Sequence, residues 1–223
     1  CTKTRVLAGM THSPRQQVIR VDREPETPLD SPDLRDLVYQ TRGYVRASDA
    51  LLLSDYGYGA ATPEIFESIR TRASLDGIPV TLDSRYRALA YNGVTAATPN
   101  ESELEEALRT RIGNDNERLL TAGRAVMQKM KLESLLITRG RDGMVIFSRD
   151  HKPIFIPIYG SDEVADVTGA GDTVIATYTA ALAAGADAES AARLANYAGG
   201  IVVMKRGTAT VTRAELLKAV TEG

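Results

Sequence analysis

The sequence predicts an α/β protein with a mostly parallel, Rossmann-like sheet that is covered by helices on both faces. Two observations lead to this fold class. Short apolar runs rich in β-branched residues alternate with longer amphipathic runs along most of the chain. Strands that consist of continuous apolar runs are typical of parallel sheets buried on both sides. The 223 residues are enough for one such domain.

The composition narrows the function classes. Charged residues make up 25% of the chain and the formal net charge is -2, so neither nucleic acid nor a membrane is an expected partner. Cys1 is the only cysteine, which excludes a disulfide framework and a cysteine-based metal site within this chain. Because we find neither a run of about 18 apolar residues nor a signal peptide, we expect a cytoplasmic protein. The chain starts at Cys1 without an initiator methionine, so we also expect a fragment.

The first predicted elements are two short strands, Thr4–Leu7 and Gln17–Asp22, in which β-branched residues alternate with polar ones. A polar loop separates them, so they form a hairpin or two edge strands, with Leu7, Val18 and Val21 as candidate buried positions. Prolines at positions 25, 28 and 32 then mark a linker.

Strands and helices alternate after this linker, as a sheet covered on both faces requires. Thr62 is the predicted N-cap of one helix, and Asp142-Gly143 predicts a tight turn between two strands. A β-rich run is expected to end near Val164. The predicted helices are 32–43, 63–73, one ending near 109, 117–130, 170–184, 188–204 and 212–221, and the predicted strands are 50–54, 79–83, 93–97, 135–138, 144–147 and 153–158.

Polar residues stand where these strands end. Ligands of parallel α/β sheets bind beyond the carboxyl ends of the strands, so we expect the polar ends to form one site. Neither a Walker A pattern nor a dinucleotide Gly-x-Gly-x-x-Gly follows any predicted strand, which disfavours the two commonest nucleotide folds. The polar ends are Asp55, Asp83, Asn100 with Glu103, Thr138 to Gly143, and Asp166 to Asp172.

The segment Asp166-Val-Thr-Gly-Ala-Gly-Asp172-Thr is the strongest candidate among them. A turn with two glycines opens a helix there, which leaves the N–H groups of Gly169, Ala170 and Gly171 free to bind an anion at the positive end of the helix dipole. Asp172 lies in the first turn, where it can act as the general base for a hydroxyl that receives a phosphoryl group. A capped helix with a flexible entry is the alternative interpretation of the same pattern.

Two further groups of residues have the chemistry to bind a nucleotide and its metal ion. Asn100 can hydrogen-bond a phosphate and Glu103 can hold water on Mg²⁺, although a helix capping box uses the same pair. Thr138, Gly140 and Gly143 offer a hydroxyl and free N–H groups to phosphate or ribose. A simple hairpin turn is the alternative explanation of the second group.

Other candidates are single residues. Asn196 lies in a helix beside small residues, so it can meet the edge of an adenine ring, and close helix packing is the alternative. Asp55, Asp83 and Arg85 are candidates for holding a substrate or phosphate, and the two acids can instead cap the turns after their strands. The tyrosines at 56, 58, 86 and 91 are predicted to lie at a pocket rim or on the surface, and the arginines at 85, 87, 139 and 141 can neutralise phosphate.

These motifs resemble those of the ribokinase-like (PfkB) carbohydrate kinases. The signature Asp166–Thr173 is specific to that family, and Asn100-x-x-Glu103 and Thr138-x-Gly140-x-x-Gly143 precede it in the family's order. Within the family, the heptose-7-phosphate kinase domain of bifunctional ADP-heptose synthases is the most similar, through segments 2–7, 16–22, 53–56 and 207–211.

The resemblance implies a ribokinase-like fold and ATP-dependent phosphorylation of a hydroxyl on a sugar or sugar phosphate. Asp172 would be the base, and the N–H groups from Gly169 to Gly171 would hold the developing charge. Asn100 and Glu103 would organise Mg²⁺ and the phosphates. Thr138, Gly140 and Gly143 would bind ATP phosphate and ribose, and Asn196 would lie by the adenine. Asp166 and Thr168, with the backbone around Gly207, match the place where family members bind a monovalent cation, so K⁺ is an expected cofactor.

The sequence departs from this family in two respects. Close relatives carry lysines where this chain has Tyr58 and Arg85, and arginine keeps the charge of a lysine but not its geometry, so phosphate handling is expected to differ. The family's N-terminal sugar-binding segment is not present in residues 1–223. We therefore expect residues 1–24 to be partial lid strands and residues 25–223 to be the ATP-binding and catalytic portion.

Three interpretations stay open from the sequence. The first is part of a sugar kinase, with a heptose-7-phosphate-like substrate favoured. The second is an inactive nucleotide-binding or scaffold module derived from such a kinase, and the third is a PfkB kinase for another sugar or a nucleoside. Lid strands without their partners would expose edges and apolar surface, through which the chain could form a homo-oligomer.

Overall fold

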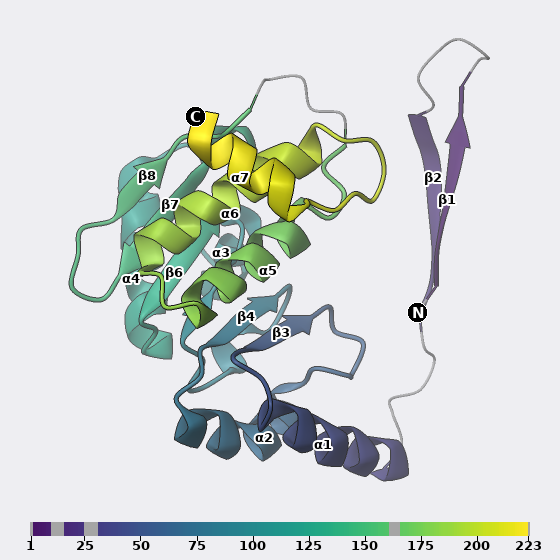
Figure 1. The fold of residues 1–223 in the computed structure, drawn as a ribbon, viewed down its shortest axis with the longest axis vertical. Coiled ribbons are helices and arrows are strands. Elements are labelled where there is room, and N and C mark those ends of the chain that lie inside the picture. Colours follow the sequence, from purple (N-terminus) through teal and green to yellow (C-terminus); the bar gives the residue numbers. More distant parts are fainter. Residues whose placement is uncertain (1, 10–15, 25–30, 161–165, 223) are drawn as a thin grey trace.

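The computed structural model describes residues 2–9, 16–24, 31–160 and 166–222. Within these residues the strands form two separate sheets, which are a hairpin of β1 and β2 and a sheet of six strands (Figure 1). Helices pack on both faces of the larger sheet, which confirms the predicted α/β class. The predicted β-rich run ending near Val164 lies outside the described residues.

The six strands lie side by side in the order of the sequence. β3 (Leu51–Asp55), β4 (Val80–Ser84), β5 (Ala96–Ala97) and β6 (Ser134–Thr138) pair in parallel, and β7 (Met144–Ser148) and β8 (Ile154–Ile156) continue the sheet antiparallel. The sheet is therefore mostly parallel, as predicted.

Strand β5 is shorter than the predicted strand 93–97. The reason is at Thr95, whose side-chain hydroxyl accepts the hydrogen bond from the N–H of Val80 at 2.9 Å. A strand ladder would use the backbone carbonyl at this place, so the regular pairing starts only at Ala96.

The helices agree with the predicted ones except for a few residues at their ends. Thr62 caps α2 as predicted, because its hydroxyl accepts from the N–H of Ile65 at 3.2 Å, and Gly77 ends the same helix in the left-handed conformation. The helices are α1 (Ser31–Val45), α2 (Pro63–Asp76), α3 (Glu101–Leu108), α4 (Asn116–Met130), α5 (Ala170–Ala183), α6 (Ala188–Val203) and α7 (Arg213–Glu222), with short 3₁₀ turns at Ala88–Ala90 and Gly140–Asp142.

Successive residues of β6 point into two different cores. Leu135 and Ile137 pack into the core under α1 to α4, whereas Leu136 packs into the core under α5 and α6. The approach of α4 to the sheet depends on Gly123, where a Cβ would come within 2.2 Å of the ring of Phe147. The central strands are thus covered on both faces, and only their ends are open to a ligand.

Backbone pairing brings the polar ends of the strands to one edge of the sheet. Asp55 ends β3 and lies in register with Ser84, the last residue of β4. Asn100 follows β5 and forms an isolated parallel bridge with Thr138, the last residue of β6. The predicted convergence of polar residues from separate parts of the chain is confirmed at this edge.

The hairpin of β1 (Thr2–Ala8) and β2 (Gln16–Arg23) lies apart from the helices of the main body (Figure 1). Its antiparallel register places Lys3 opposite Asp22 on one face. Lys3 is also 3.3 Å from the hydroxyl of Tyr58 in the loop after β3 and stacks over that ring at 5.5 Å. The charged face of the hairpin therefore faces the main body.

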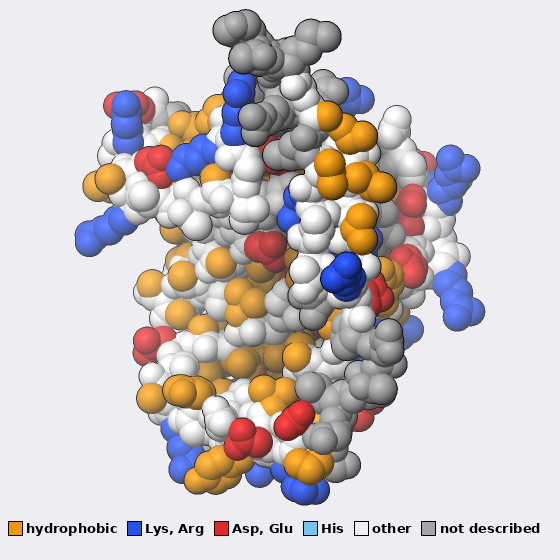
Figure 2. All heavy atoms as spheres, turned by 90° about the vertical axis from the view of Figure 1, so that its right-hand side faces the viewer, with side chains coloured by type: hydrophobic (Ala, Val, Ile, Leu, Met, Phe, Trp, Pro, Cys, Tyr) orange, Lys and Arg blue, Asp and Glu red, His pale blue; other side chains and the backbone are white. Residues whose placement is uncertain are grey.

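The other face of the hairpin is apolar and uncovered. Val6, Ile19 and Val21 are 47%, 53% and 45% exposed, and Val18 in the same strand is 67% exposed. Figure 2 shows hydrophobic side chains gathered along the hairpin. The prediction that Val18 and Val21 are buried is wrong, because no described element packs on them; the side chain of Leu7 lies outside the described residues.

Candidate active site

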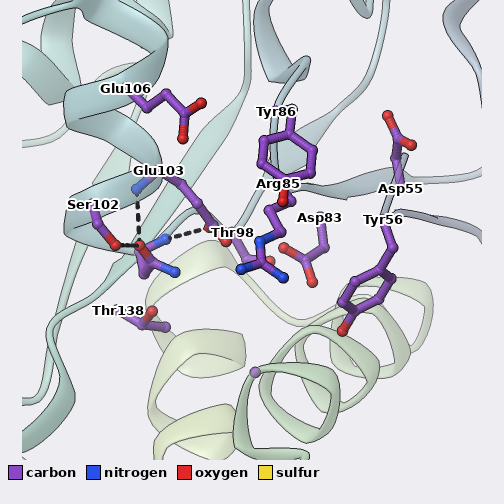
Figure 3. A pocket seen from close by; sticks show the side chains of 12 residues that line it. Asp55, Tyr56, Asp83, Arg85, Tyr86, Thr98, Ser102, Glu103, Glu106 and Thr138 are labelled. Atoms are coloured by element: carbon purple, nitrogen blue, oxygen red, sulfur yellow. Dashed lines mark hydrogen bonds between the residues drawn. The ribbon is translucent and has the colours of Figure 1, made fainter. Parts of the chain in front are cut away.

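A cavity of about 370 Å³ opens at the carboxyl edge of the sheet (Figure 3). Figure 3 shows the side chains of Asp83 and Arg85 pointing into the space between Glu103 and Tyr56. The predicted residues that line the cavity are Asp55, Asp83, Arg85, Asn100, Glu103, Thr138 and Gly171. Tyr56 and Tyr86, which were predicted for a pocket rim or the surface, also line it. Thr98, Ser102 and Glu106 line it without having been predicted to do so.

A second cavity of about 220 Å³ lies on the other side of the α5 N-terminus. Thr138 and Gly171 line both cavities, so the two spaces meet at these residues. The second cavity has apolar walls and also contains the predicted Gly140, Gly143 and Asn196. Such a cavity, apolar with a few polar groups, has the character of a site for a flat ring.

Two residues of the second cavity also have structural tasks. Gly143 has a φ of 80°, and a Cβ there would lie 2.1 Å from the carbonyl oxygen of Ile156, so only glycine fits. Asn196 is 7% exposed and its side-chain Nδ2 donates to the carbonyl of Pro157 at 2.9 Å. This hydrogen bond fixes the orientation of the amide and leaves its oxygen available to a ligand.

The N-terminus of α5 partly matches the predicted anion hole. Gly169 turns the chain into the helix with a φ of 81°. The N–H of Ala170 donates to the carbonyl of Val167 at 3.2 Å, so it is not free in this conformation, in contrast to the prediction. Among the described residues, the N–H groups of Gly169 and Gly171 have no acceptor. Asp172 follows in the first turn and is exposed.

Gly171 differs from the other glycines of the site because neither its backbone nor its packing requires glycine. It has a helical φ, and a Cβ added to it would meet nothing within 4 Å. Glycine in a helix costs about 0.5–1 kcal/mol relative to alanine. The open space at Gly171 therefore leaves room for a ligand to approach the backbone.

Asn100 and Glu103 form the capping box that was the alternative to a ligand site. The Oδ1 of Asn100 accepts from the N–H of Glu103 at 2.9 Å, and the Oε2 of Glu103 accepts from the N–H of Asn100 at 2.9 Å. The hydroxyl of Ser102 also donates to Asn100 at 2.6 Å. The capping box uses one carboxylate oxygen of Glu103, and its other oxygen has no partner among the described residues.

Carboxylates from three elements converge on the first cavity. Burial, and next the charges of Glu103 and Asp172, raise the pKa of Asp83 from 3.8 to about 7. Burial also raises the pKa of Glu103, and the hydrogen bonds of the capping box offset only part of that effect. The nearby Arg85 packs on the ring of Tyr86 at 5.4 Å and forms no ion pair with a described carboxylate. The cavity thus has an excess of negative charge that a cation would neutralise.

Asp55 has a full set of protein partners, although it lines the cavity. Its buried carboxylate accepts from Arg87 and from the N–H of Gly57, both at 2.9 Å, and from the hydroxyls of Tyr91 at 2.6 Å and Ser84 at 3.2 Å. Burial alone would raise the pKa of Asp55, but these hydrogen bonds together lower it. The carboxylate therefore holds the loop after β3 in place.

Contacts within the protein correct the expectations for three other side chains, those of Tyr91, Arg87 and Arg139. Tyr91 is fully buried and not at a rim, because its ring packs in the core and its hydroxyl bonds Asp55. Arg87 pairs with Asp55, and Arg139 pairs with Glu101 at 2.8 Å, so neither guanidinium is free for phosphate. The pairing partner of an arginine is not visible in a linear sequence.

The residues predicted for a monovalent cation lie together beside α5. The N–H of Thr168 donates to the carboxylate of Asp166 at 2.8 Å. Hydrogen bonds from Thr168, and then the N–H of Gly207, lower the pKa of Asp166, which therefore stays ionised. An ionised carboxylate beside two backbone segments has the oxygen ligands that a cation needs.

Comparison with known proteins identifies the family. The chain matches the pfkB family of carbohydrate kinases over residues 2–215. It belongs to this family. Similar curated proteins include the "Bifunctional protein HldE" of Pelobacter propionicus, 42% identical over 98% of this chain, and that of Rhodospirillum rubrum, 41% identical over 98%. The chain spans 43% of the length of each of these relatives.

Solved structures show the same fold. The Arabidopsis thaliana ribokinase complexed with ribose and ATP aligns with a TM-score of 0.71 at 22% identity, over 98% of this chain and 69% of that one. The Escherichia coli phosphofructokinase-2 in complex with potassium aligns with a TM-score of 0.76 at 20% identity, over 92% of this chain and 66% of that one. These likenesses confirm the predicted ribokinase-like fold. In the described part of the chain, no helix is both long and apolar enough to span a membrane.

Proposed function

We propose that this chain is part of a sugar kinase, with residues 1–24 as partial lid strands and residues 25–223 as the ATP-binding and catalytic portion. The observation that carries the proposal is the position of the α5 N-terminus. Gly171 lines both cavities, and Asp172 is the next residue. A phosphoryl group that passes from a nucleotide in one cavity to a hydroxyl in the other would cross this point. Family membership supports the same reaction class.

The reaction needs few groups from the protein. Asp172 would take the proton of the acceptor hydroxyl while that oxygen bonds the γ-phosphorus of ATP and the bond from phosphorus to the β-phosphate oxygen breaks. The N–H groups of Gly169 and Gly171 would hold the charge that develops on the transferred group. Open space at Gly171 supports this role, because a methyl group there would fill the place of a phosphate oxygen.

The first cavity suits Mg²⁺. Its acidic side chains offer only oxygen ligands, which Mg²⁺ prefers. Burial is the main cause that raises the pKa values of Asp83 and Glu103, and a bound cation would stabilise their ionised forms. Among the described residues, no cluster of such side chains is ready to enclose a metal ion. Asp83 and Glu103 would therefore hold the ion through its water molecules, and the bound ion would neutralise charge on the phosphates.

The second cavity suits the nucleoside part of ATP. Asn196 offers its amide oxygen to an adenine edge, and Thr138 with Gly140 and Gly143 would face the ribose and phosphates. Asp166 and Thr168 would hold K⁺ beside the anion hole. The E. coli phosphofructokinase-2 structure contains potassium, and the same cofactor is proposed for this chain.

The substrate that we favour is a heptose 7-phosphate or a similar sugar phosphate. The support is the likeness to the HldE proteins and the guanidinium of Arg85 in the first cavity, which forms no ion pair within the described part of the chain. Tyr58 replaces a lysine of close relatives, and Lys3 of the hairpin lies 3.3 Å from its hydroxyl. A positive charge therefore stands close to the position of the missing lysine.

The alternative function is that of an inactive nucleotide-binding scaffold. The replaced lysine at Tyr58 favours it, and the intact Asp172 with open space at Gly171 disfavours it. Calorimetric titration of the 223-residue chain with MgATP tests nucleotide binding, for which we expect a dissociation constant of about 1 mM or tighter. Because residues 1–223 do not contain the family's N-terminal sugar-binding segment, we expect little turnover by the chain alone. Sugar phosphorylation by residues 1–223 at the rate of a complete kinase would refute the idea that the reaction needs a sugar-binding segment outside these residues.

The uncovered hairpin face supports a homo-oligomer. Ile19 and Val21 are about half exposed on an unpaired sheet face, which is the kind of surface that proteins cover by association. Ile19→Thr should shift the chain toward monomer in sedimentation velocity. A sedimentation coefficient that is unchanged from the wild type would remove this face as the interface.

A further inference from the structure

Tyr56 makes a direct contact with the proposed base from a distant part of the chain. It follows β3 immediately, 116 residues before Asp172, and its hydroxyl donates to the Oδ1 of Asp172 at 2.8 Å. The side chain is 40% exposed and lines the first cavity. The contact therefore joins the end of β3 to the first turn of α5, which are the two sides of the proposed acceptor site.

The backbone on either side of Tyr56 is firmly held. The carboxylate of Asp55, which precedes it, accepts from the N–H of Gly57, which follows it, at 2.9 Å. The carbonyl of Asp55 accepts from the N–H of Arg85 at 3.1 Å. Because both neighbours are fixed, the direction of the Tyr56 ring is a property of the folded loop.

The surroundings of this contact are acidic. Asp83 from β4, Glu103 and Glu106 from α3, and Asp172 itself all line or border the same cavity, and Arg85 is the cation among them. Burial, and next the hydrogen bond to Asp172, raise the pKa of Tyr56, so the phenol stays protonated and can only donate to a carboxylate.

We propose that Tyr56 is a positioning residue for the base, which holds the carboxylate of Asp172 turned toward the acceptor. The inference rests on the proposed function. The hydroxyl of Tyr56 occupies Oδ1, and Oδ2 has no partner among the described residues. Oδ2 is therefore the atom that takes the proton from the acceptor hydroxyl as the new O–P bond forms and ADP leaves. Tyr56 gives up no proton in this step.

The first test observes the hydrogen bond directly and needs no activity. The carboxyl carbon of Asp172 is observed by ¹³C NMR, at one fixed pH, in the 223-residue chain and in its Tyr56→Phe variant. Loss of the hydrogen bond that Tyr56 donates should shift the carboxyl resonance of Asp172. Tyr58→Phe is the matched control, because its hydroxyl lies in the same loop but contacts Lys3 and Glu24 of the lid.

The outcome for the control decides the interpretation of this shift. Tyr58→Phe should leave the carboxyl resonance of Asp172 where it is in the wild type. A resonance that Tyr56→Phe does not shift, or that both variants shift equally, would overturn the proposal. The measurement uses the chain as it is, so the result stands whether or not the chain turns over a substrate.

The second test separates this inference from the proposed function. In a longer active kinase that contains this chain, Tyr56→Phe should lower kcat by about 10- to 100-fold with the KM for ATP unchanged. A purely structural role would change kcat and the KM for ATP together. If Asp172→Asn abolishes transfer while the kcat of Tyr56→Phe matches the wild type, only the role of Tyr56 is wrong. If Asp172→Asn transfers phosphate at the wild-type rate, the proposed base is wrong.

Discussion

Replacing Gly171 by alanine should make the protein more stable and less functional at the same time. The added Cβ would meet nothing within 4 Å, and the backbone at Gly171 is already helical, so the folded chain accepts the methyl group without strain. Alanine restricts the unfolded chain more than glycine does, which should raise the free energy of unfolding by about 0.4–1 kcal/mol. For a chain of 223 residues this corresponds to a rise in Tm of about 1–4 °C.

The same methyl group should obstruct the anion hole. It would lie where we place a phosphate oxygen, and a displacement of about 1 Å from the reactive geometry lowers rates by about 100-fold. Thermal unfolding measures the stability, and phosphoryl transfer by the parent protein measures the function.

Gly43→Ala is the control for this variant. Gly43 lies in α1, has no atom within 4 Å of its Cβ position and lines neither cavity of the site. The control should gain a similar stability with an unchanged rate. If Gly171→Ala transfers phosphate as fast as Gly43→Ala, the space at Gly171 does not hold the transferred group and the reasoning fails.

Three further outcomes follow from contacts around the site. Tyr91→Phe removes the hydroxyl that donates to Asp55 at 2.6 Å, so urea unfolding should show a free energy of unfolding that is lower by about 1.5–3 kcal/mol. An unchanged free energy of unfolding would show that this hydrogen bond does not stabilise the fold. Gly143→Ala should destabilise the folded chain by about 1–3 kcal/mol or more and weaken ATP binding, because the φ of Gly143 is 80° and the added Cβ would meet the carbonyl of Ile156. Unfolding and ATP-titration curves that match those of the wild type would contradict this expectation. Burial raises the pKa of Asp83 to about 7, so between about pH 4 and 7 the folded chain binds more protons than the unfolded chain, and this group's contribution to stability falls as pH rises. Asp83→Asn should remove this pH dependence, so in urea unfolding the stability of the variant relative to the wild type should increase from pH 5 to pH 8. A difference in the free energy of unfolding that is the same at every pH would refute the raised pKa of Asp83.

The positions of strands and helices could be predicted because they depend on local patterns. Short continuous apolar runs placed β6 and β7, and the Thr62 cap and the following proline placed the start of α2. Strand β5 was predicted too long, because the side chain of Thr95 replaces a backbone carbonyl in the pairing with Val80. A side chain that substitutes for the backbone leaves no periodic signal in the sequence.

The candidate site was predictable where polar residues end parallel strands. Asp83, Asn100 and Thr138 come from separate segments, and the sheet brings them to one cavity. The contact of Tyr56 with Asp172 was missed, because it joins residues 116 positions apart and depends on how the loop after β3 is held. The only signal in the sequence was that Tyr56 directly follows a strand-ending acid.

The roles of charged residues were the hardest to predict. Asp55 looked like an open acid at a strand end, yet it accepts hydrogen bonds from Arg87 and Tyr91, both more than 30 positions away. Whether a carboxylate serves the ligand or the fold depends on how many of its acceptor positions the protein itself uses. Only the three-dimensional arrangement gives that number.

The most direct test of the central claim is a comparison of the wild-type parent protein with its Asp172→Asn variant. ATP binding and the rate of γ-phosphoryl transfer to a heptose 7-phosphate are measured on both. If Asp172 is the base, the variant should bind ATP as the wild type does and transfer phosphate about 10²–10⁴-fold more slowly. A variant that binds ATP normally and transfers phosphate within a few fold of the wild-type rate would contradict the account.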